Sequence, residues 1–480
     1  MAKYGIRHNW GWIQLELTDI CNLKCVMCPQ SEGKNYQVHN IFREDSSEIL
    51  ENFTLESDAE LVYMILSPEF RFHEGFREDL LTREPMKFDG KVWYTNILLR
   101  PGVYHYWFVE KKGDVEKRIP DPVKIEGEGG NQFSVRNVGN VKGRIHGFMK
   151  FELFKKIIDS AAELGEEWNE ISPFWYGESL LHPQFPKFMR YLAEKNTQHH
   201  IFRILGLHTN GILLEGENAE ALLDSLEAFP GISKILFSLD AATEGTYSNI
   251  RRGGDFKRVL KNIDHFVNEI KRKEMNNVRL AFQFIVQEEN KDEAGDFLSY
   301  WSRYLDEKKI PFRVSSDWGW GNFEDNHFAI FFRALDGSDE EREKNNQLHR
   351  EVVSQLIPQA KPKNGGASKP VYPHPCSSLF RSPFIQWNGE VSVCCADSAM
   401  TIKAGDFNKQ SLKEIWHGRT ITDMRLAHIL GDSSHFTMRC RSCSQWLVPS
   451  LSQDEVIEYL TAINAQDALK QYLQKVSEYK

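Results

Sequence analysis

Helical and strand periodicity alternate along residues 149–314, and this alternation constrains the fold more than any other feature of the sequence. Apolar side chains recur at helical spacing through residues 149–164, and a short apolar strand follows at residues 170–176. The same pattern predicts further helices at residues 185–195, 218–228, 256–270 and after Asn290, and further strands at residues 201–208, 234–239, 278–286 and 310–314. Strands that alternate with helices form a parallel sheet covered by helices, so we predict an α/β fold.

Composition places the chain among ordinary globular proteins. Its 480 residues suggest about three domains, and 41% hydrophobic with 26% charged residues excludes wholesale disorder. A net charge of −9 does not favour contact with nucleic-acid phosphates. No apolar run reaches the roughly 18 residues of a membrane-spanning helix, and residues 1–17 lack a signal-peptide pattern. We therefore expect a cytoplasmic protein without a nucleic-acid or membrane partner.

The eight cysteines form two groups near opposite ends of the chain. In a cytoplasmic protein, such clustering favours metal or redox chemistry over disulfides. Cys21, Cys25 and Cys28 have C-x3-C-x2-C spacing and follow a predicted strand at residues 11–18. Three thiolates on one loop can bind three irons of a four-iron cluster and leave the fourth iron open. A zinc site or three free thiols are the alternatives.

The segment TDICNLKCVMCP, which contains Cys21, Cys25 and Cys28, resembles the cysteine loop of the radical S-adenosylmethionine (SAM) enzymes. The resemblance implies a partial (β/α)6 barrel of the TIM type, with this loop after its first strand. It implies that the three cysteines bind a [4Fe–4S] cluster, that the open iron binds SAM, and that Met27 lies at the cofactor. It further implies reductive cleavage of SAM to a 5′-deoxyadenosyl radical, with an electron donor such as flavodoxin or ferredoxin.

Residue types that this family uses to bind SAM follow the predicted strands in the expected order. Gly177 and Glu178 stand where the family has Gly-Gly-Glu, although Tyr176 replaces the first glycine. The resemblance implies that Gly177 and Glu178 receive the SAM ammonium group. The other SAM contacts that it implies are Asn210, Ser238, Asp240 and Arg251. Taken singly, these segments resemble an ordinary turn and an ordinary helix cap, so their order behind the cysteine loop carries the assignment.

A β pattern interrupts the barrel at residues 44–141, where the family normally continues into a helix. Its segment LRPGVYHYWF resembles the immunoglobulin-like early-set modules of the family-48 carbohydrate-binding type. We expect an inserted β-sandwich, with residues 110–118 at a solvated hairpin tip and with Trp93 and Trp107 in the core. This insert either binds a glucan or a sugar-bearing substrate, or it is a structural or protein-docking domain.

The C-terminal third predicts a second metal site. The segment FIQWNGEVSV predicts a β-hairpin that turns at Asn388 and Gly389, and it resembles the SPASM/twitch extension of radical SAM enzymes. The ligands that this resemblance implies for an auxiliary [4Fe–4S] cluster are Cys376, Cys394, Cys440 and Cys443. Cys395 is left over, and the choice between Cys394 and Cys395 stays open. A zinc ribbon is the alternative for the last cysteine pair.

These patterns predict one order of domains, and they leave three hypotheses for the function of the chain. The domains are the radical SAM barrel (1–43 and 142–335), the insert (44–141), a helix and linker (336–370), the twitch domain (371–450) and a C-terminal helix (451–480). We expect a radical SAM oxidoreductase that abstracts a hydrogen from a sugar or sugar-bearing small molecule and oxidises the substrate radical through the auxiliary cluster. The alternatives are a maturase of ribosomal peptides that uses the insert for docking, and a non-catalytic carbohydrate-binding scaffold. The sequence identifies no catalytic residue beyond the cofactor sites.

Overall fold

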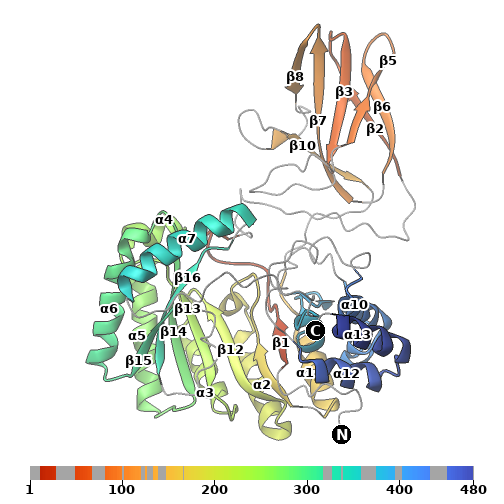
Figure 1. The fold of residues 1–480 in the computed structure, drawn as a ribbon. Helices are drawn as coiled ribbons and strands as arrows, with labels where there is room; N and C mark the ends of the chain where they lie inside the picture. Colours follow the sequence, from red (N-terminus) through yellow and green to blue (C-terminus); the bar gives the residue numbers. More distant parts are fainter. Residues whose placement is uncertain are drawn as a thin grey trace. The chain divides into compact units, whose positions relative to one another are not determined.

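The structure is a computed structural model of the 480-residue chain. It describes residues 11–28, 49–67, 82–99, 102–119, 125–126, 133–138, 147–165, 167–316, 327–336, 339–357, 375–394, 403–432 and 451–478. Contacts divide the chain into two compact units, one of residues 1–28 and 146–480 and one of residues 29–145 (Figure 1). The two units have separate hydrophobic cores. The assignment of each predicted segment to a named domain stays a prediction.

A parallel sheet forms the centre of the larger unit. Its strands are β1 (Trp12–Leu15), β11 (Trp168–Ser172), β12 (Phe202–Thr209), β13 (Ser233–Ser238), β14 (Val278–Val286), β15 (Phe312–Ser315) and β16 (Phe328–Ala334). They lie in the order β1-β11-β12-β13-β14-β16-β15, and every neighbouring pair is parallel. The carboxyl ends of parallel strands meet at one edge, so side chains far apart in sequence come together there. The predicted α/β fold is confirmed, and closure of the sheet as a partial barrel stays a prediction.

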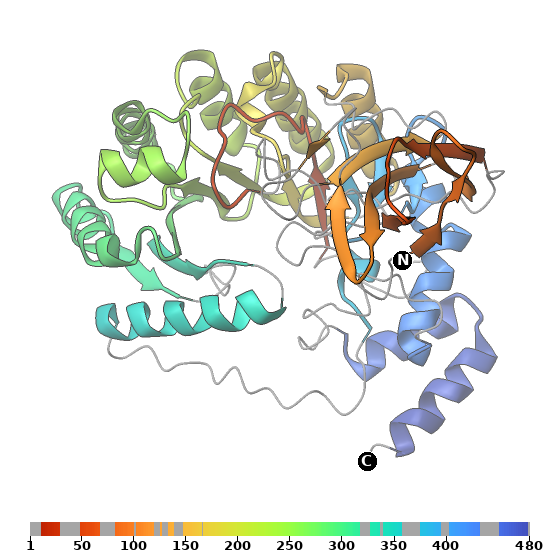
Figure 2. The same cartoon turned by 90° about the horizontal axis from the view of Figure 1, so that it is seen from above.

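Helices alternate with these strands and lie along one side of the sheet (Figure 2). They are α1 (Phe151–Glu163), α2 (Phe185–His199), α3 (Gly216–Leu226), α4 (Glu244–Ile250), α5 (Phe256–Arg272), α6 (Ala294–Glu307) and α7 (Asp339–Leu356), with short 3-10 turns η4 (Ser179–Leu181) and η5 (Lys291–Glu293). In α5, Asp255 caps the first turn by accepting from Arg258 N at 3.0 Å. Buried aromatic pairs such as Phe237 of β13 and Phe266 of α5, with centroids 6.4 Å apart, join helix to sheet.

Strand β16 is absent from the sequence prediction, which ends the sheet at residues 310–314. That predicted segment corresponds to β15 at the edge, whereas β16 lies between β14 and β15, with Ala281 of β14 opposite Ala329. Residues 328–332 are all buried, so this strand shows no alternation between polar and apolar side chains. A short continuous apolar run does not distinguish a strand from other buried segments, and periodicity therefore missed it.

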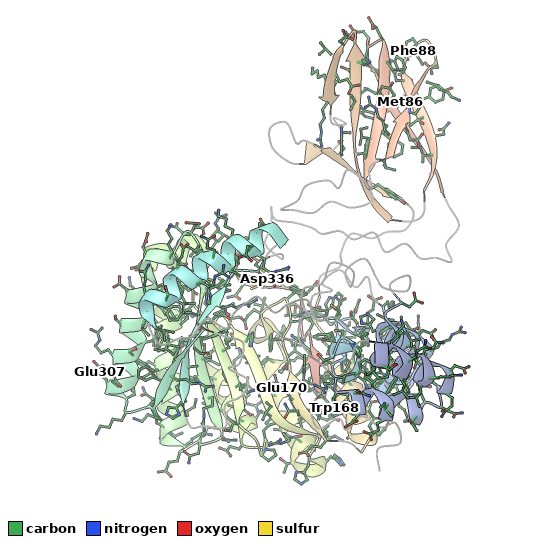
Figure 3. The ribbon with its side chains drawn as sticks, viewed as in Figure 1. Met86, Phe88, Trp168, Glu170, Glu307 and Asp336 are labelled. Carbon is green, nitrogen blue, oxygen red and sulfur yellow. The ribbon has the colours of Figure 1, made fainter. Side chains whose placement is uncertain are left out.

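Strand β11 begins and ends earlier than the predicted strand at residues 170–176. It pairs with β12 from Trp168 onward, and Trp168 and Glu170 both lie on it in Figure 3. After Ser172 the chain turns, with Phe174 N donating to Ser172 O at 2.8 Å instead of extending the ladder. The residues that follow Ser172 therefore form a strand-end loop at the carboxyl edge of the sheet.

The smaller unit consists of two antiparallel sheets. One has the order β4-β3-β7-β10-β9 with β8 paired to β7, and the other has the order β2-β6-β5. The strands are β2 (Ile49–Leu55), β3 (Leu61–Ser67), β4 (Thr82–Pro85), β5 (Lys87–Phe88), β6 (Trp93–Leu99), β7 (Gly102–Lys112), β8 (Val115–Ile119), β9 (Ile125–Glu126) and β10 (Phe133–Val138). Trp93 and Trp107 are 8% and 6% exposed. Trp93 belongs to the hydrophobic core of this unit, as predicted, whereas Trp107 lies outside that cluster, with the Arg118 guanidinium 3.8 Å from its ring centroid. The β7–β8 hairpin tip, with Lys112 opposite Val115, is also confirmed. The immunoglobulin-like topology and sugar binding stay predictions.

The C-terminal segment extends the parallel sheet. Its elements are α8 (Ser378–Arg381), β17 (Phe384–Ile385), β18 (Glu390–Ser392), β19 (Gly405–Asp406), α9 (Leu412–Trp416), α10 (Arg419–Leu430), α12 (Gln453–Ala462) and α13 (Gln466–Glu478). Strand β17 pairs with β1, and β17 and β18 form the predicted hairpin, with Gly389 at φ +91°. The prediction of one C-terminal helix is wrong, because Asn464 adopts a left-handed φ of +58° between α12 and α13. Helix α13 packs on α10, where Lys475 Nζ donates to Leu430 O.

No helix in the described part of the chain is long and apolar enough to cross a membrane.

Candidate functional site

The cysteine loop follows β1 and packs tightly against the strand-end loop of β11. Glu178 N donates to Ile20 O at 3.0 Å. A Cβ atom on Gly177 would lie 2.0 Å from Thr18 O and 2.8 Å from Ile20 O. Both contacts are with backbone atoms, so only glycine fits without separating the two loops. The predicted Gly177 therefore serves their close packing, and its contact with SAM stays a prediction.

The segment after α4 clasps the cysteine loop on both sides of Cys25. The peptide N–H groups of the two residues that flank Cys25 donate to the carbonyl oxygens of the two residues that flank Arg251, each at 2.9 Å. Between these two bonds, Arg251 Nη1 donates to Cys25 Sγ at 3.5 Å. Cys25 is 5% exposed, so water hardly competes for its sulfur. The loop thus has backbone and side-chain contacts to the same short segment.

Asp240, the second residue after β13, fixes Arg251 in turn. Asp240 is fully buried and has φ +60°, a conformation that is strained for a residue other than glycine. Its Oδ2 accepts from Arg251 Nη2, and its Oδ1 accepts from Ile285 N at 2.7 Å. Burial opposes the charge on Arg251, but the Asp240 carboxylate and Cys25 outweigh it and hold the pKa of Arg251 above its ordinary value. The guanidinium group of Arg251 therefore stays charged.

Glu178 is 3% exposed, and its carboxylate accepts three hydrogen bonds from the protein. Oε1 accepts from Thr209 Oγ1 at 2.9 Å and from Leu180 N at 3.2 Å, and Oε2 accepts from Asn210 N at 2.8 Å. Burial raises the pKa of Glu178, and these three hydrogen bonds act in the opposite direction. A carboxylate offers about four acceptor positions, so Oε2 retains one for a donor on a ligand.

Asn210 joins β12 to the cysteine loop. Its Nδ2 donates to Asn22 Oδ1 at 2.9 Å, and its Oδ1 accepts from Ile212 N at 3.0 Å. Ser238 is partly exposed at the end of β13, and Met27 is partly buried against the main core. The residues predicted from three strand ends therefore lie around one loop, while their contacts with SAM stay predictions.

Two residues of this network, Asn22 and Thr209, are not among the predicted SAM contacts. Asn22 lies inside the cysteine motif, and Thr209 begins the segment Thr209-Asn210-Gly211, which resembles a family segment, so position in these motifs is the signal for them. His208 on β12 was also missed. Its ring stacks on Phe174 with centroids 4.1 Å apart, and burial together with a nearby arginine lowers the pKa of His208 to about 3. His208 is therefore a neutral group that can donate or accept a hydrogen bond.

The three thiols of the loop can bind three irons of one four-iron cluster, because each thiolate binds a different iron. Among the residues that the structure describes, no group of three His, Cys, Asp or Glu side chains is arranged to hold a single metal ion. Leu23 N donates to Cys21 Sγ at 3.4 Å, a contact that suits a thiolate. Burial and Glu178 raise the pKa of Cys21 to about 12, and a bound cation reverses this effect because a coordinating thiol is deprotonated outright.

The predicted auxiliary site is described only in part. Cys376 precedes α8 and Cys394 follows β18, and both are partly exposed. Cys394 N donates to Ser392 Oγ at 3.3 Å. Cys395, Cys440 and Cys443 lie outside the described residues. The four-cysteine ligand set, and the choice of Cys394 over Cys395, therefore stay predictions.

Two family profiles match the chain. The radical SAM superfamily matches residues 135–299, and an iron–sulfur cluster-binding domain, SPASM, matches residues 376–444. The first match begins after the cysteine loop and runs through the sheet as far as α6. The chain therefore contains a radical SAM domain and an iron–sulfur cluster-binding domain, as the sequence resemblance predicts. These two domains imply SAM and a [4Fe–4S] cluster as cofactors, together with auxiliary iron–sulfur ligation.

Individual relatives cover only part of this chain. A GTP 3′,8-cyclase of Clostridium botulinum (strain Okra / Type B1) is 29% identical over 167 residues, which make up 35% of this chain and 46% of that protein. A probable GTP 3′,8-cyclase of Methanococcus maripaludis is 34% identical over 120 residues, or 25% of this chain and 36% of that protein. The chain thus spans less than half the length of these relatives. The crystal structure of BtrN in complex with AdoMet and 2-DOIA aligns with a TM-score of 0.35 and 12% identity, over 88% of this chain and 90% of that chain.

Proposed function

We propose that the chain is a radical SAM oxidoreductase that removes a hydrogen atom from a sugar or sugar-bearing small molecule and then oxidises the resulting substrate radical. The observation that carries this proposal is the clasped cysteine loop, in which Cys25 Sγ accepts from Arg251 Nη1 and Glu178 N donates to Ile20 O, just before the first cysteine. When bound, the cluster and SAM supply a 5′-deoxyadenosyl radical, and the auxiliary cluster supplies an electron acceptor. The chain's own residues hold the thiols, exclude water from Cys25 and leave one acceptor position on Glu178 for a cationic group.

The names of the curated relatives support a sugar-bearing substrate. They are GTP 3′,8-cyclases, and GTP is a nucleotide that carries a ribose. The inserted unit adds no support of its own, since Trp93 is a core residue and the ring of Trp107 is covered by Arg118, so neither is available to stack on a sugar. The substrate class therefore rests on the names of these relatives alone.

Cleavage of SAM tests the enzymatic part of the proposal. The chain, reconstituted anaerobically with iron and sulfide and reduced with dithionite, is expected to release 5′-deoxyadenosine and methionine from SAM. Glu178→Gln is expected to lower this yield, because in either orientation the amide NH2 faces a backbone N–H, of Asn210 or of Leu180, and the negative charge is removed. Glu220→Gln, at an exposed position on α3, is the matched control and keeps the wild-type yield. No 5′-deoxyadenosine from the wild-type chain would favour the scaffold hypothesis and contradict the proposal.

Deuterium transfer tests the substrate class. Nucleoside triphosphates with a deuterated ribose and deuterated peptides are each added to the reconstituted chain with SAM. Deuterium recovered in 5′-deoxyadenosine from the ribose supports the proposal. Deuterium recovered only from the peptides would support the maturase alternative and overturn the sugar assignment.

A further inference from the structure

We infer that Arg251 is a positioning residue that fixes Cys25 and sets the reduction potential of the cluster bound at the three-cysteine loop, with Asp240 as its counter-charge. The inference rests on the proposed function, because it requires a cluster on Cys21, Cys25 and Cys28. It goes beyond the SAM contact that the sequence resemblance implies for Arg251.

The orientation of the guanidinium group follows from its partners. Arg251 Nη2 donates to Asp240 Oδ2, and Asp240 Oδ1 is itself held by Ile285 N at 2.7 Å. This anchoring directs Nη1 at Cys25 Sγ, 3.5 Å away. The side chains of Arg251 and Asp240 are 11% and 0% exposed, so the contact lies in the interior. Arg251 Nε is buried without a hydrogen-bond partner, so the side chain is not placed to satisfy all of its own donors.

The backbone fixes the same contact independently of the side chain. The two hydrogen bonds of 2.9 Å that flank Cys25 hold the loop against the Arg251 segment. The backbone of Arg251 therefore cannot move away from Cys25 unless these bonds break, and Asp240 holds its side chain in place. The charge of Arg251 acts on Cys25 Sγ, a predicted cluster ligand, at a fixed distance. Residues around a metal site tune the properties of the metal through such contacts with its ligands.

The sign of the effect follows from charge. One-electron reduction makes a cluster more negative, so a buried cation that donates to a ligand sulfur stabilises the reduced form and raises the potential. The Asp240 carboxylate opposes this effect. Removing the cation in Arg251→Gln should therefore lower the midpoint potential, whereas neutralising the carboxylate in Asp240→Asn should raise it. A purely structural role does not predict shifts of opposite sign.

Redox titration of the full-length reconstituted chain, followed by electron paramagnetic resonance without SAM, measures these shifts. The signal of the first cluster is identified as the one that disappears in a Cys21/Cys25/Cys28→Ala variant. Arg252→Gln is the matched control, because Arg252 is exposed and contributes only its carbonyl oxygen to the clasp. We expect a lower potential in Arg251→Gln, a higher one in Asp240→Asn and an unchanged one in Arg252→Gln.

Three outcomes would overturn the inference: an unchanged potential in Arg251→Gln, shifts of the same sign in Arg251→Gln and Asp240→Asn, or an equal shift in Arg252→Gln. If Arg251→Gln no longer binds the cluster, the Arg251→Lys variant distinguishes an effect of charge from an effect of packing, since it retains a cation. Cluster binding by Arg251→Lys supports the inference, and its loss there would assign Arg251 to packing alone. Absence of the first-cluster signal in the wild-type chain would instead refute the proposed function.

Discussion

Replacing Gly177 with alanine tests the close packing that holds the cysteine loop. The added Cβ would lie 2.0 Å from Thr18 O and 2.8 Å from Ile20 O, and backbone cannot rotate away as a side chain can. The two loops must separate, which also breaks the 3.0 Å hydrogen bond from Glu178 N to Ile20 O. Overpacking costs about 1–3 kcal/mol and the lost hydrogen bond about 1 kcal/mol, so the loop loses about 2–4 kcal/mol.

If this cost falls on the loop, Gly177→Ala weakens cluster binding by about 30-fold to 700-fold, since each 1.4 kcal/mol is tenfold. The assay is retention of iron at the first site against a titrated iron chelator. Gly245→Ala is the matched control, because a Cβ on Gly245 in α4 meets no atom within 4 Å. It should retain iron like the wild-type chain. Equal retention by Gly177→Ala and Gly245→Ala would refute the packing argument.

Three further substitutions test other parts of the account. Asn210→Ala removes the hydrogen bond to Asn22 and the acceptor for Ile212 N, at a cost of about 1–3 kcal/mol. It should therefore accelerate amide hydrogen exchange in residues 20–28, and unchanged exchange would contradict the role of Asn210 in holding the cysteine loop. Asp255→Ala removes the cap on Arg258 N and should cost about 1 kcal/mol in urea unfolding, without changing iron content. Burial lowers the pKa of His428 from 6.5 to about 4. As pH falls, the unfolded chain therefore binds a proton at this residue before the folded chain does. The stability that comes from burying neutral His428 is thus present above pH 6.5 and is lost towards pH 4. His428→Phe should therefore lose less thermal stability than the wild-type chain over that range, and an identical decline would exclude this role.

Residues that follow strands were predictable from sequence because strand order in a parallel sheet brings them to one edge. Glu178, Asn210 and Asp240 each follow a different strand, and the structure places all three around the cysteine loop. Their resemblance to the SAM-binding segments of the radical SAM enzymes, together with their order along the chain, predicted a shared site. The individual partners were not predictable, since Arg251 and Cys25 are 226 positions apart and meet only through the folded sheet.

Other features left no usable pattern in the sequence. Strand β16 is buried on both faces, so it lacks the alternation that reveals a strand. The break between α12 and α13 occurs at Asn464, a polar residue within a continuous helical pattern, and only its left-handed φ of +58° shows the end of α12. Gly177 was predicted as a SAM contact, whereas its steric role depends on the backbone of a loop more than 150 positions earlier in the chain.

Iron and sulfide content tests the central claim most directly. We propose two four-iron clusters, one on Cys21, Cys25 and Cys28 and one on the C-terminal cysteines. The anaerobically reconstituted chain should then bind about eight irons, and the Cys21/Cys25/Cys28→Ala variant about four. About four irons that fall to none would leave the C-terminal cysteines without a cluster and remove the proposed electron acceptor. Iron content that does not fall in the variant would contradict the assignment of the cysteine loop itself.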